Sequence, residues 1–212
     1  LYREFDNDSS TVLIQDRKGT DLKASHTLVF GTDFYINDRN VIGVSATGNI
    51  GRRERTGNLE NRLYDDNSNL SSRWDRSSFD PNKNLNVDFN LNYMKTFKDS
   101  KGEWSMNANH SFGKEEEKGY YEQVYFNTDE TPSLLSPLNQ QLANNSSQNI
   151  TTAQTDFSYI LKKIAARYEL GSKVILRNDD VTTYSETKDT ISGEFFQDTL
   201  ANFDYSYKEA IY

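Results

Sequence analysis

Alternation of apolar and polar residues is the feature that most constrains the fold of this chain. From Leu22 to Ile36 the even positions are mainly apolar, and the odd positions between them are mostly polar or small. Successive side chains of a β-strand point to opposite faces, so the pattern predicts a strand with one apolar and one polar face. Alternation resumes from Ile42 to Ile50 after the polar turn at 37–40, and the two runs therefore predict a hairpin.

The same unit recurs along the chain. Apolar residues occupy the even positions at 22–36, 42–50, 104–112 and 168–176, and the odd positions at 85–97, 153–161 and 203–211. We expect these positions to share one apolar face. The sequence thus predicts an all-β chain of about seven or eight antiparallel strands in up-and-down order.

The connections between the runs alternate in length. Short turns are predicted near 37–40, 98–103 and 162–166, and long polar loops near 52–84, 115–150 and 178–201. Structureless loops beyond about 12–15 residues are uncommon in compact domains. Transmembrane β-barrels have short periplasmic turns and long extracellular loops, and their strands need about 9–11 residues to cross the bilayer. The pattern therefore predicts part of a transmembrane barrel, with residues 1–212 in one barrel domain and the long loops extracellular.

Composition agrees with a wall between lipid and water. Hydrophobic residues make up only 34% and the mean hydropathy is −0.85, so a large apolar core is under-supplied, whereas a wide barrel has a polar lumen. The aromatic share of 13% argues against disorder. A net charge of −8 argues against nucleic acid as a partner, and the absence of cysteine excludes disulfides and thiolate sites.

Aromatic residues gather beside the predicted short turns. Amphipathic rings favour the boundary between membrane and water. We therefore predict six membrane-interface aromatics: Phe34, Tyr35, Phe97, Trp104, Tyr159 and Tyr168.

The candidate chemical groups favour structural interpretations. His26 and His110 stand on the apolar parity without acidic neighbours, although a histidine inside the apolar band is costly there. The acids at 65–66, 115–117 and 179–180 lack the spacing of a calcium loop, and no Gly-x-Ser-x-Gly motif is present. We therefore expect no catalytic residue, no metal site, no cofactor and no enzymatic activity.

Two polar stretches leave alternatives open. Six arginines could grip an anionic ligand or lipopolysaccharide phosphates, but neighbouring acids favour a solvated loop: Arg52, Arg53, Arg55, Arg62, Arg73 and Arg76. The aromatics at 120–126 either extend a strand above the membrane, which we favour, or stack on a ligand. The segment 131–142 either folds over the barrel mouth or meets a partner.

Several stretches resemble the barrel portion of TonB-dependent receptors of Bacteroidota. They are Thr32–Asn37 with Asn40–Ser45, Leu91–Phe97 with Trp104–Met106, and Thr155–Tyr159 with Tyr168–Lys173 and Asn202–Tyr205. The resemblance implies a bacterial outer-membrane location, a larger barrel with a plug, and TonB-driven uptake of a chelated metal, glycan or peptide. TonB and a surface lipoprotein are the implied partners besides lipid. Because the chain starts at Leu1 and ends within an alternating run, we interpret it as an internal piece that lacks the plug.

The main alternative is a soluble or surface-anchored β-sandwich, such as an adhesin or carbohydrate-binding module. In that architecture the apolar parity would face a dry core between two sheets. Long strands and regularly alternating connections favour the barrel.

Overall fold

A computed structural model of the protein contains one antiparallel sheet of nine strands. The structure describes residues 2–7, 9–98, 101–127, 129–134, 137–161, 163–189 and 191–212. The strands are β1 (Tyr2–Asn7), β2 (Ser9–Asn37), β3 (Asn40–Tyr64), β4 (Leu70–Thr96), β5 (Gly102–Phe126), β6 (Leu138–Leu161), β7 (Ala166–Lys188), β8 (Phe195–Gln197) and β9 (Phe203–Ile211). Each strand pairs with the next from β1 to β8, and β9 pairs with β7 beside β8. The predicted all-β, up-and-down architecture is confirmed.

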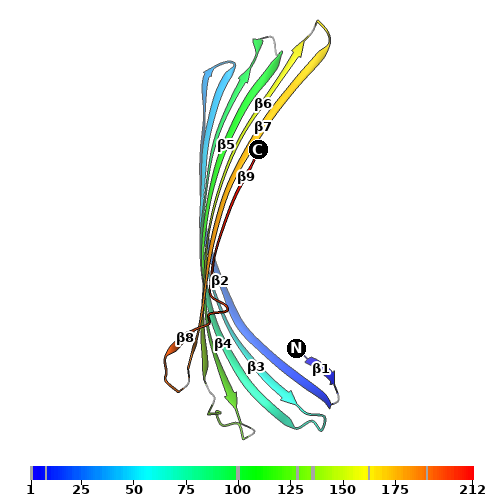
Figure 1. The fold of residues 1–212 in the computed structure, drawn as a ribbon, viewed down its shortest axis with the longest axis vertical. Helices are drawn as coiled ribbons and strands as arrows, with labels where there is room; N and C mark the ends of the chain where they lie inside the picture. Colours follow the sequence, from blue (N-terminus) through cyan, green and yellow to red (C-terminus); the bar gives the residue numbers. More distant parts are fainter. Residues whose placement is uncertain are drawn as a thin grey trace.

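The short turns lie at one end of the sheet (Figure 1). In the β2–β3 turn, Asn37 Oδ1 accepts hydrogen bonds from the Arg39 backbone N–H at 3.0 Å and from Asn40 Nδ2 at 2.7 Å. At the start of β5, Gly102 approaches β6 so closely that a Cβ there would lie 2.1 Å from the Ser158 carbonyl oxygen. Residues 99, 100 and 162 of the other two predicted turns lie outside the described residues.

The predicted long loops are the main correction, because these stretches are mostly strand. β3 and β4 pair continuously from Asn40 opposite Lys95 to Leu63 opposite Ser72, so the stretch 52–84 is irregular only near 65–69. Likewise, most of the stretch 115–150 belongs to β5 and β6. In the stretch 178–201, β7 continues to Lys188 and β8 spans Phe195–Gln197. The long hairpins do lie at the end opposite the short turns (Figure 1).

Backbone pairing explains why the strands outrun the apolar pattern. Outside lipid both faces of a sheet can be polar, so alternation fades while the hydrogen-bond ladder continues. For the same reason the sequence pattern did not predict β1 or the first half of β2 as strands. β3 has 25 residues, about 85 Å at the usual rise, whereas about 9–11 residues cross a bilayer. Most of each long strand therefore extends beyond the apolar band.

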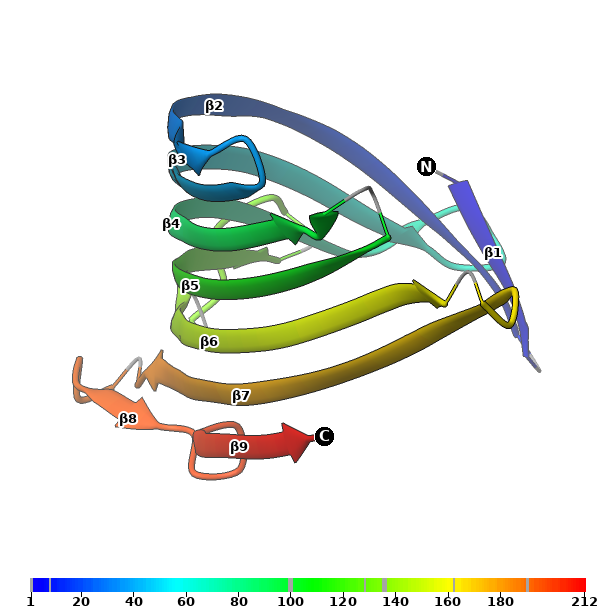
Figure 2. The same cartoon turned by 90° about the horizontal axis from the view of Figure 1, so that it is seen from above.

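The sheet is a single curved layer. Figures 1 and 2 show it bent along the strands, with β2 and β9 toward opposite edges and no closure between them. Among residues with described side chains, no hydrophobic residue is buried. The sandwich alternative is therefore wrong, since it requires two packed sheets around a core. Among the described residues, no helix has the length and apolar character needed to cross a lipid bilayer.

Candidate functional site

The register of the ladder assigns each side chain to one of two faces. Residues directly opposite one another in an antiparallel pair point to the same side. One such row across six strands is Thr32, Val44, Leu91, Ala108, Ala153 and Val174. We name the side of this row the apolar face and the other side the amide face. The predicted shared face is thus confirmed for the six alternating runs from 22 to 176.

The prediction for 203–211 is wrong. Leu176 lies opposite Ala210 and Val181 lies opposite Tyr205, so Phe203, Tyr205 and Tyr207 share the amide face. The preceding connection sets this register, because the Ser185 backbone N–H donates to Asn202 Oδ1 and the Ser185 carbonyl accepts from the Asp198 N–H. Alternation within one strand gives a parity but does not say which neighbour's parity it matches.

The apolar face carries a continuous band of exposed hydrophobic side chains. Leu28 is 76% exposed and Leu170 is 74% exposed. The band extends from Ile42 to Ile50 on β3 and from Trp104 to Phe112 on β5, which matches the length that crosses a bilayer. An apolar surface this extended marks a contact with lipid or with another protein.

Four of the six predicted interface aromatics lie close together at the short-turn end of the apolar face. Phe97 meets Tyr159 edge-to-face, with ring centroids 5.8 Å apart, and also contacts Phe157 at 5.7 Å. Tyr168 lies directly opposite Tyr159, and Trp104 directly opposite Phe157. The register also brings in Tyr93 and Phe157, which sequence reasoning missed because it searched only beside the turns.

The remaining two predicted aromatics lie elsewhere. Phe34 is on the apolar face of β2, and Tyr35 is on the amide face. Two polar ends in the ring cluster are hydrogen-bonded: Trp104 Nε1 donates to Thr155 Oγ1 at 2.9 Å, and Tyr93 OH donates to Asn40 Oδ1 at 2.7 Å. A ring with an apolar body and a satisfied polar end suits a membrane interface, which stays a prediction for all six.

His26 and His110 both lie on the apolar face. His110 Nδ1 lies 2.9 Å from Thr151 Oγ1, its direct neighbour on the apolar face, and His26 lies opposite Ile50. Hydrogen bonding to Thr151 reduces the cost of a histidine in an apolar band. Within the described part of the chain, no three acidic or histidine side chains converge on a possible metal position.

The amide face is polar at the level of the apolar band. Asn49 Nδ2 donates to Thr27 Oγ1 and Asn109 Nδ2 donates to Asn90 Oδ1, both at 2.8 Å. The Asn92 side chain covers Gly43, where a Cβ would lie 2.1 Å from the amide oxygen. The wall therefore combines apolar side chains on one side with amides and hydroxyls on the other.

Charged groups join the amide face nearer the long hairpins. Arg53 donates to both Asp21 oxygens, at 2.8 and 2.6 Å, and this pairing lowers the pKa of the Asp21 carboxyl. The Arg76 guanidinium lies 4.6 Å from the Tyr121 ring centroid. Burial and a hydrogen bond with Asp80 raise the pKa of Tyr121 to about 12, so its phenol stays neutral at physiological pH.

The six arginines between Arg52 and Arg76 lie on β3 and β4, where several form ion pairs. Arg52 pairs with Glu54, Arg62 with Glu60, and Arg73 with Asp75 at 3.3 Å, so acids offset these charges as expected. The register divides the six arginines between the faces: Arg52, Arg62 and Arg73 on the apolar face, and Arg53, Arg55 and Arg76 on the amide face.

The acidic pairs also have local roles. In the β3–β4 turn, Asp65 Oδ1 accepts from the backbone N–H groups of Asn67 and Asn69, at 3.0 and 2.8 Å. These bonds and the Asn69 side chain lower the pKa of Asp65. Asp179 pairs with Arg177 Nε at 2.6 Å. Turn closure and ion pairing thus give Asp65 and Asp179 local structural roles.

The aromatics at 120–126 extend β5, as favoured from sequence. Tyr120 stacks on Phe79, with centroids 6.1 Å apart, on the continuation of the apolar face. In the segment 131–142, Pro132 forms a bridge with Phe126, and Leu138 begins β6. Residues 135 and 136 of that segment lie outside the described residues.

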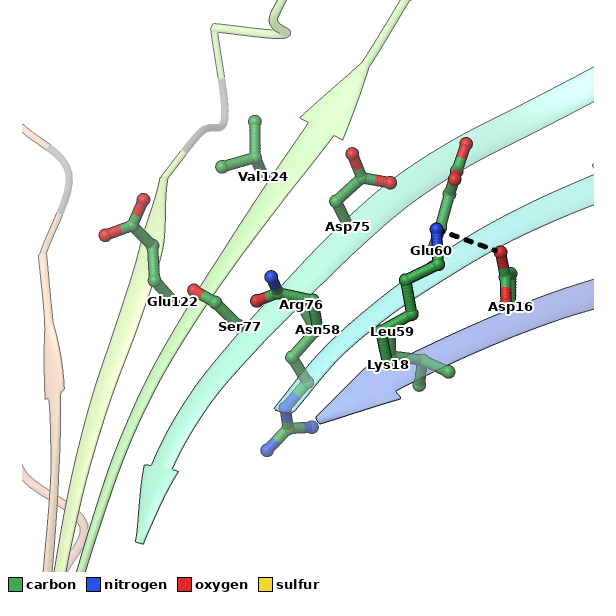
Figure 3. Close-up of a pocket in the computed structure, with 10 residues that line it drawn as sticks. All are labelled: Asp16, Lys18, Asn58, Leu59, Glu60, Asp75, Arg76, Ser77, Glu122 and Val124. Atoms are coloured by element: carbon green, nitrogen blue, oxygen red, sulfur yellow. Dashed lines mark ion pairs between the residues drawn. The ribbon is translucent and has the colours of Figure 1, made fainter. Parts of the chain in front are cut away.

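A hollow of about 320 Å³ lies near the long-hairpin ends of β2–β5 (Figure 3). Four acids, two cations and four other residues line it: Asp16, Glu60, Asp75 and Glu122; Lys18 and Arg76; Asn58, Leu59, Ser77 and Val124. The Lys18 ammonium lies 3.9 Å from Asp16, an exposed pair that contributes little energy. The hollow is an open polar surface rather than an enclosed ligand cavity.

Comparison with known proteins indicates the surroundings in which the two faces of the sheet lie. The model of the outer membrane protein beta-barrel family matches residues 95–212, more than half of the 212 residues. The chain therefore belongs to this family of outer-membrane β-barrel proteins, and its place is the bacterial outer membrane. We infer that the apolar face meets lipid there, because the amides and hydroxyls of the other face would be costly in hydrocarbon.

No curated protein matches the chain. Among solved structures, the cryo-EM structure of the pneumolysin membrane pore complex gives a TM-score of 0.18 at 10% identity. That alignment covers 94% of this chain and 45% of the other, so the chain spans less than half the length of that structure. At this TM-score the likeness carries no argument.

Proposed function

We propose that this wall is part of an outer-membrane transporter that takes up a nutrient through a water-filled lumen. The amide face carries the proposal. Its Asn, Ser and Thr side chains stand at the depth of the apolar band, where Asn109 bonds Asn90 and Ser111 Oγ donates to Asp88 at 2.5 Å. Amides and hydroxyls at that depth suit a water-filled lumen, because their transfer into hydrocarbon would cost free energy.

A wide barrel suits the same proposal. The described strands leave their sheet open, so a closed wall needs further strands beyond β2 and β9. Barrel diameter grows with strand number, and only the larger barrels hold an aqueous channel or a plugged lumen. The charged groups near the long hairpins, such as the Arg53–Asp21 pair, would then lie at the mouth of the lumen.

The energy source and the cargo follow from the resemblance to TonB-dependent receptors of Bacteroidota. On that basis the cargo is a chelated metal, a glycan or a peptide, and the partners are TonB and a surface lipoprotein. The proposed role is passage and binding, without catalysis.

Uptake by cells tests the proposal. Ferric citrate, a maltodextrin and a tripeptide serve as labelled probes for cells with and without the gene, each with and without a protonophore. We expect accumulation of one probe to require the gene and to fall to the level of the deletion strain when the protonophore is added. Gene-dependent accumulation that resists the protonophore would show a passive pore. Equal accumulation of all three probes in both strains would contradict the proposal.

A further inference from the structure

The first charged residue beyond the apolar band is a cation on three neighbouring strands. On the apolar face, Arg52 follows Ile50 on β3, Lys83 precedes Leu85 on β4, and Lys114 follows Phe112 on β5. Each cation is two residues from the last apolar side chain on its face, about 7 Å along the strand. All three lie on the side of the long hairpins.

These cations form one patch with two carboxylates. Arg52 lies directly opposite Lys83, and Lys83 directly opposite Glu116. Lys114 Nζ lies 2.7 Å from Glu116 Oε1. With Lys118 two positions further along, the cationic patch is Arg52, Lys83, Lys114 and Lys118, and it encloses Glu54 and Glu116. Four positive and two negative charges leave two positive charges, in a chain whose net charge is −8.

The electrostatics of Glu116 agree with a compact patch. The hydrogen bond from Lys114 lowers the pKa of the Glu116 carboxyl, and the charges of Lys83 and Lys118 lower it further. Three cations therefore act on one carboxylate, which cannot neutralise them all.

The patch follows the edge of the apolar band, which crosses the strands obliquely. Ile50 and Leu85 lie in one row. Phe112 on β5 lies two residues nearer the short turns than that row, and Leu176 on β7 lies two residues nearer the short turns than Phe112. The edge thus descends by about 13 Å over four strand spacings of about 4.8 Å, an angle of about 35°. Strands of outer-membrane barrels tilt by about 35–45°. The band edge and the cations beside it therefore mark one plane of the bilayer.

We propose that the cationic patch binds the phosphate groups of lipid in the leaflet next to the long hairpins. Long basic side chains at the end of an apolar band reach the headgroup level, where guanidinium and ammonium groups bind phosphate. Continuity with the apolar face favours lipid over a soluble anion, because acyl chains on the band bring their headgroups to the patch. The inference requires the outer-membrane location but not the proposed nutrient uptake.

Lipid titration of the protein, extracted from its native membrane in a neutral detergent, tests the inference. The probes are bisphosphorylated lipid A, phosphatidylcholine and inorganic phosphate, with bound lipid counted by native mass spectrometry. The variant Arg52→Gln/Lys83→Gln/Lys114→Gln removes three cations of the patch. The matched control, Lys23→Gln/Arg55→Gln/Lys173→Gln, removes three cations of the amide face. Circular dichroism checks that both variants are folded.

We expect the patch variant to lose about fivefold in lipid A affinity for each cation removed, since each contributes about 1 kcal/mol at an anionic surface. The control should bind like the unchanged protein, and salt should weaken binding. Equal losses in both variants, unchanged binding in the patch variant, or displacement of lipid A by equimolar inorganic phosphate would overturn the inference. If the patch variant does not fold, salt dependence and phosphate competition on the unchanged protein decide.

Discussion

At the residue scale, two residues of the same type can differ in face and in hydrogen-bond partner. Trp104 and Trp74 are the two tryptophans of the chain, and the register places them on opposite faces. Trp104 lies in the apolar band and donates to Thr155, whereas Trp74 is near the end of the β3–β4 hairpin on the amide face. Residue type alone gives neither depth nor face.

The two tryptophans should therefore respond to different quenchers. We expect brominated lipid to quench the Trp74→Phe variant, which keeps Trp104, and aqueous iodide to quench the Trp104→Phe variant, which keeps Trp74. Steady-state fluorescence in bilayers measures both. Quenching of Trp104 by iodide but not by brominated lipid would contradict its predicted place at the membrane interface.

Tyr121 should titrate unusually late. Its pKa is raised to about 12, first by burial and then by Asp80, so Asp80→Asn should lower the pKa while leaving it above the ordinary 10. The raised pKa means that the contribution of this site to stability is complete below pH 10 and is lost as pH rises through about 12. Ultraviolet absorbance of tyrosinate follows the titration. A Tyr121 pKa that does not change in Asp80→Asn would contradict the role of the carboxylate.

At the element scale, the sequence predicted strand positions well and strand lengths poorly. Alternation located the parts of β2 to β7 that carry the apolar band, because a strand with one apolar and one aqueous side must alternate. It missed the extensions at 52–64 and 138–150, where both faces meet water and pairing alone maintains the strand. It also missed the face of β9, because Asn202 and Asp198 set that register through Ser185.

The lack of a side chain at Gly102 should stabilise the β5–β6 pairing. Gly102→Ala places a Cβ 2.1 Å from the Ser158 carbonyl oxygen, and relief of that contact requires movement of the backbone. We expect a loss of about 1–3 kcal/mol, typical of overpacking. Gly48→Ala is the control, because a Cβ there meets no atom within 4 Å. Urea unfolding from bilayers measures both variants, and equal stability of the two would refute the close approach.

At the scale of the whole molecule, the candidate site was only partly predictable. The six interface aromatics came from their nearness to turns, but the ring cluster with Tyr93 and Phe157 depends on register. Similarly, the arginines at 52–76 look like one group in the sequence, yet the ladder sends half to each face. A linear sequence does not show the offset between strands that decides such groupings.

A charge should distinguish the two faces at one depth. Ala108 lies at the centre of the apolar band, and its neighbour Asn107 points to the amide face opposite Asn92. We expect Ala108→Arg to destabilise the bilayer-inserted protein by about 2–4 kcal/mol, the usual cost of arginine at the midplane. Asn107→Arg should cost much less. Equal costs in urea unfolding would contradict the assignment of lipid to the apolar face.

The described side chains include no buried hydrophobic residue, and this bears on how the sheet tolerates substitution. In a packed interior, Leu→Ala leaves a cavity whose cost adds to the lost transfer free energy. Leu28 instead faces outward and is 76% exposed, so fluid acyl chains fill whatever space a smaller side chain vacates. Substitutions on this face must therefore preserve hydrophobicity, whereas the shape of the side chain matters little. Homologous walls can thus diverge widely in side-chain size while keeping the same register.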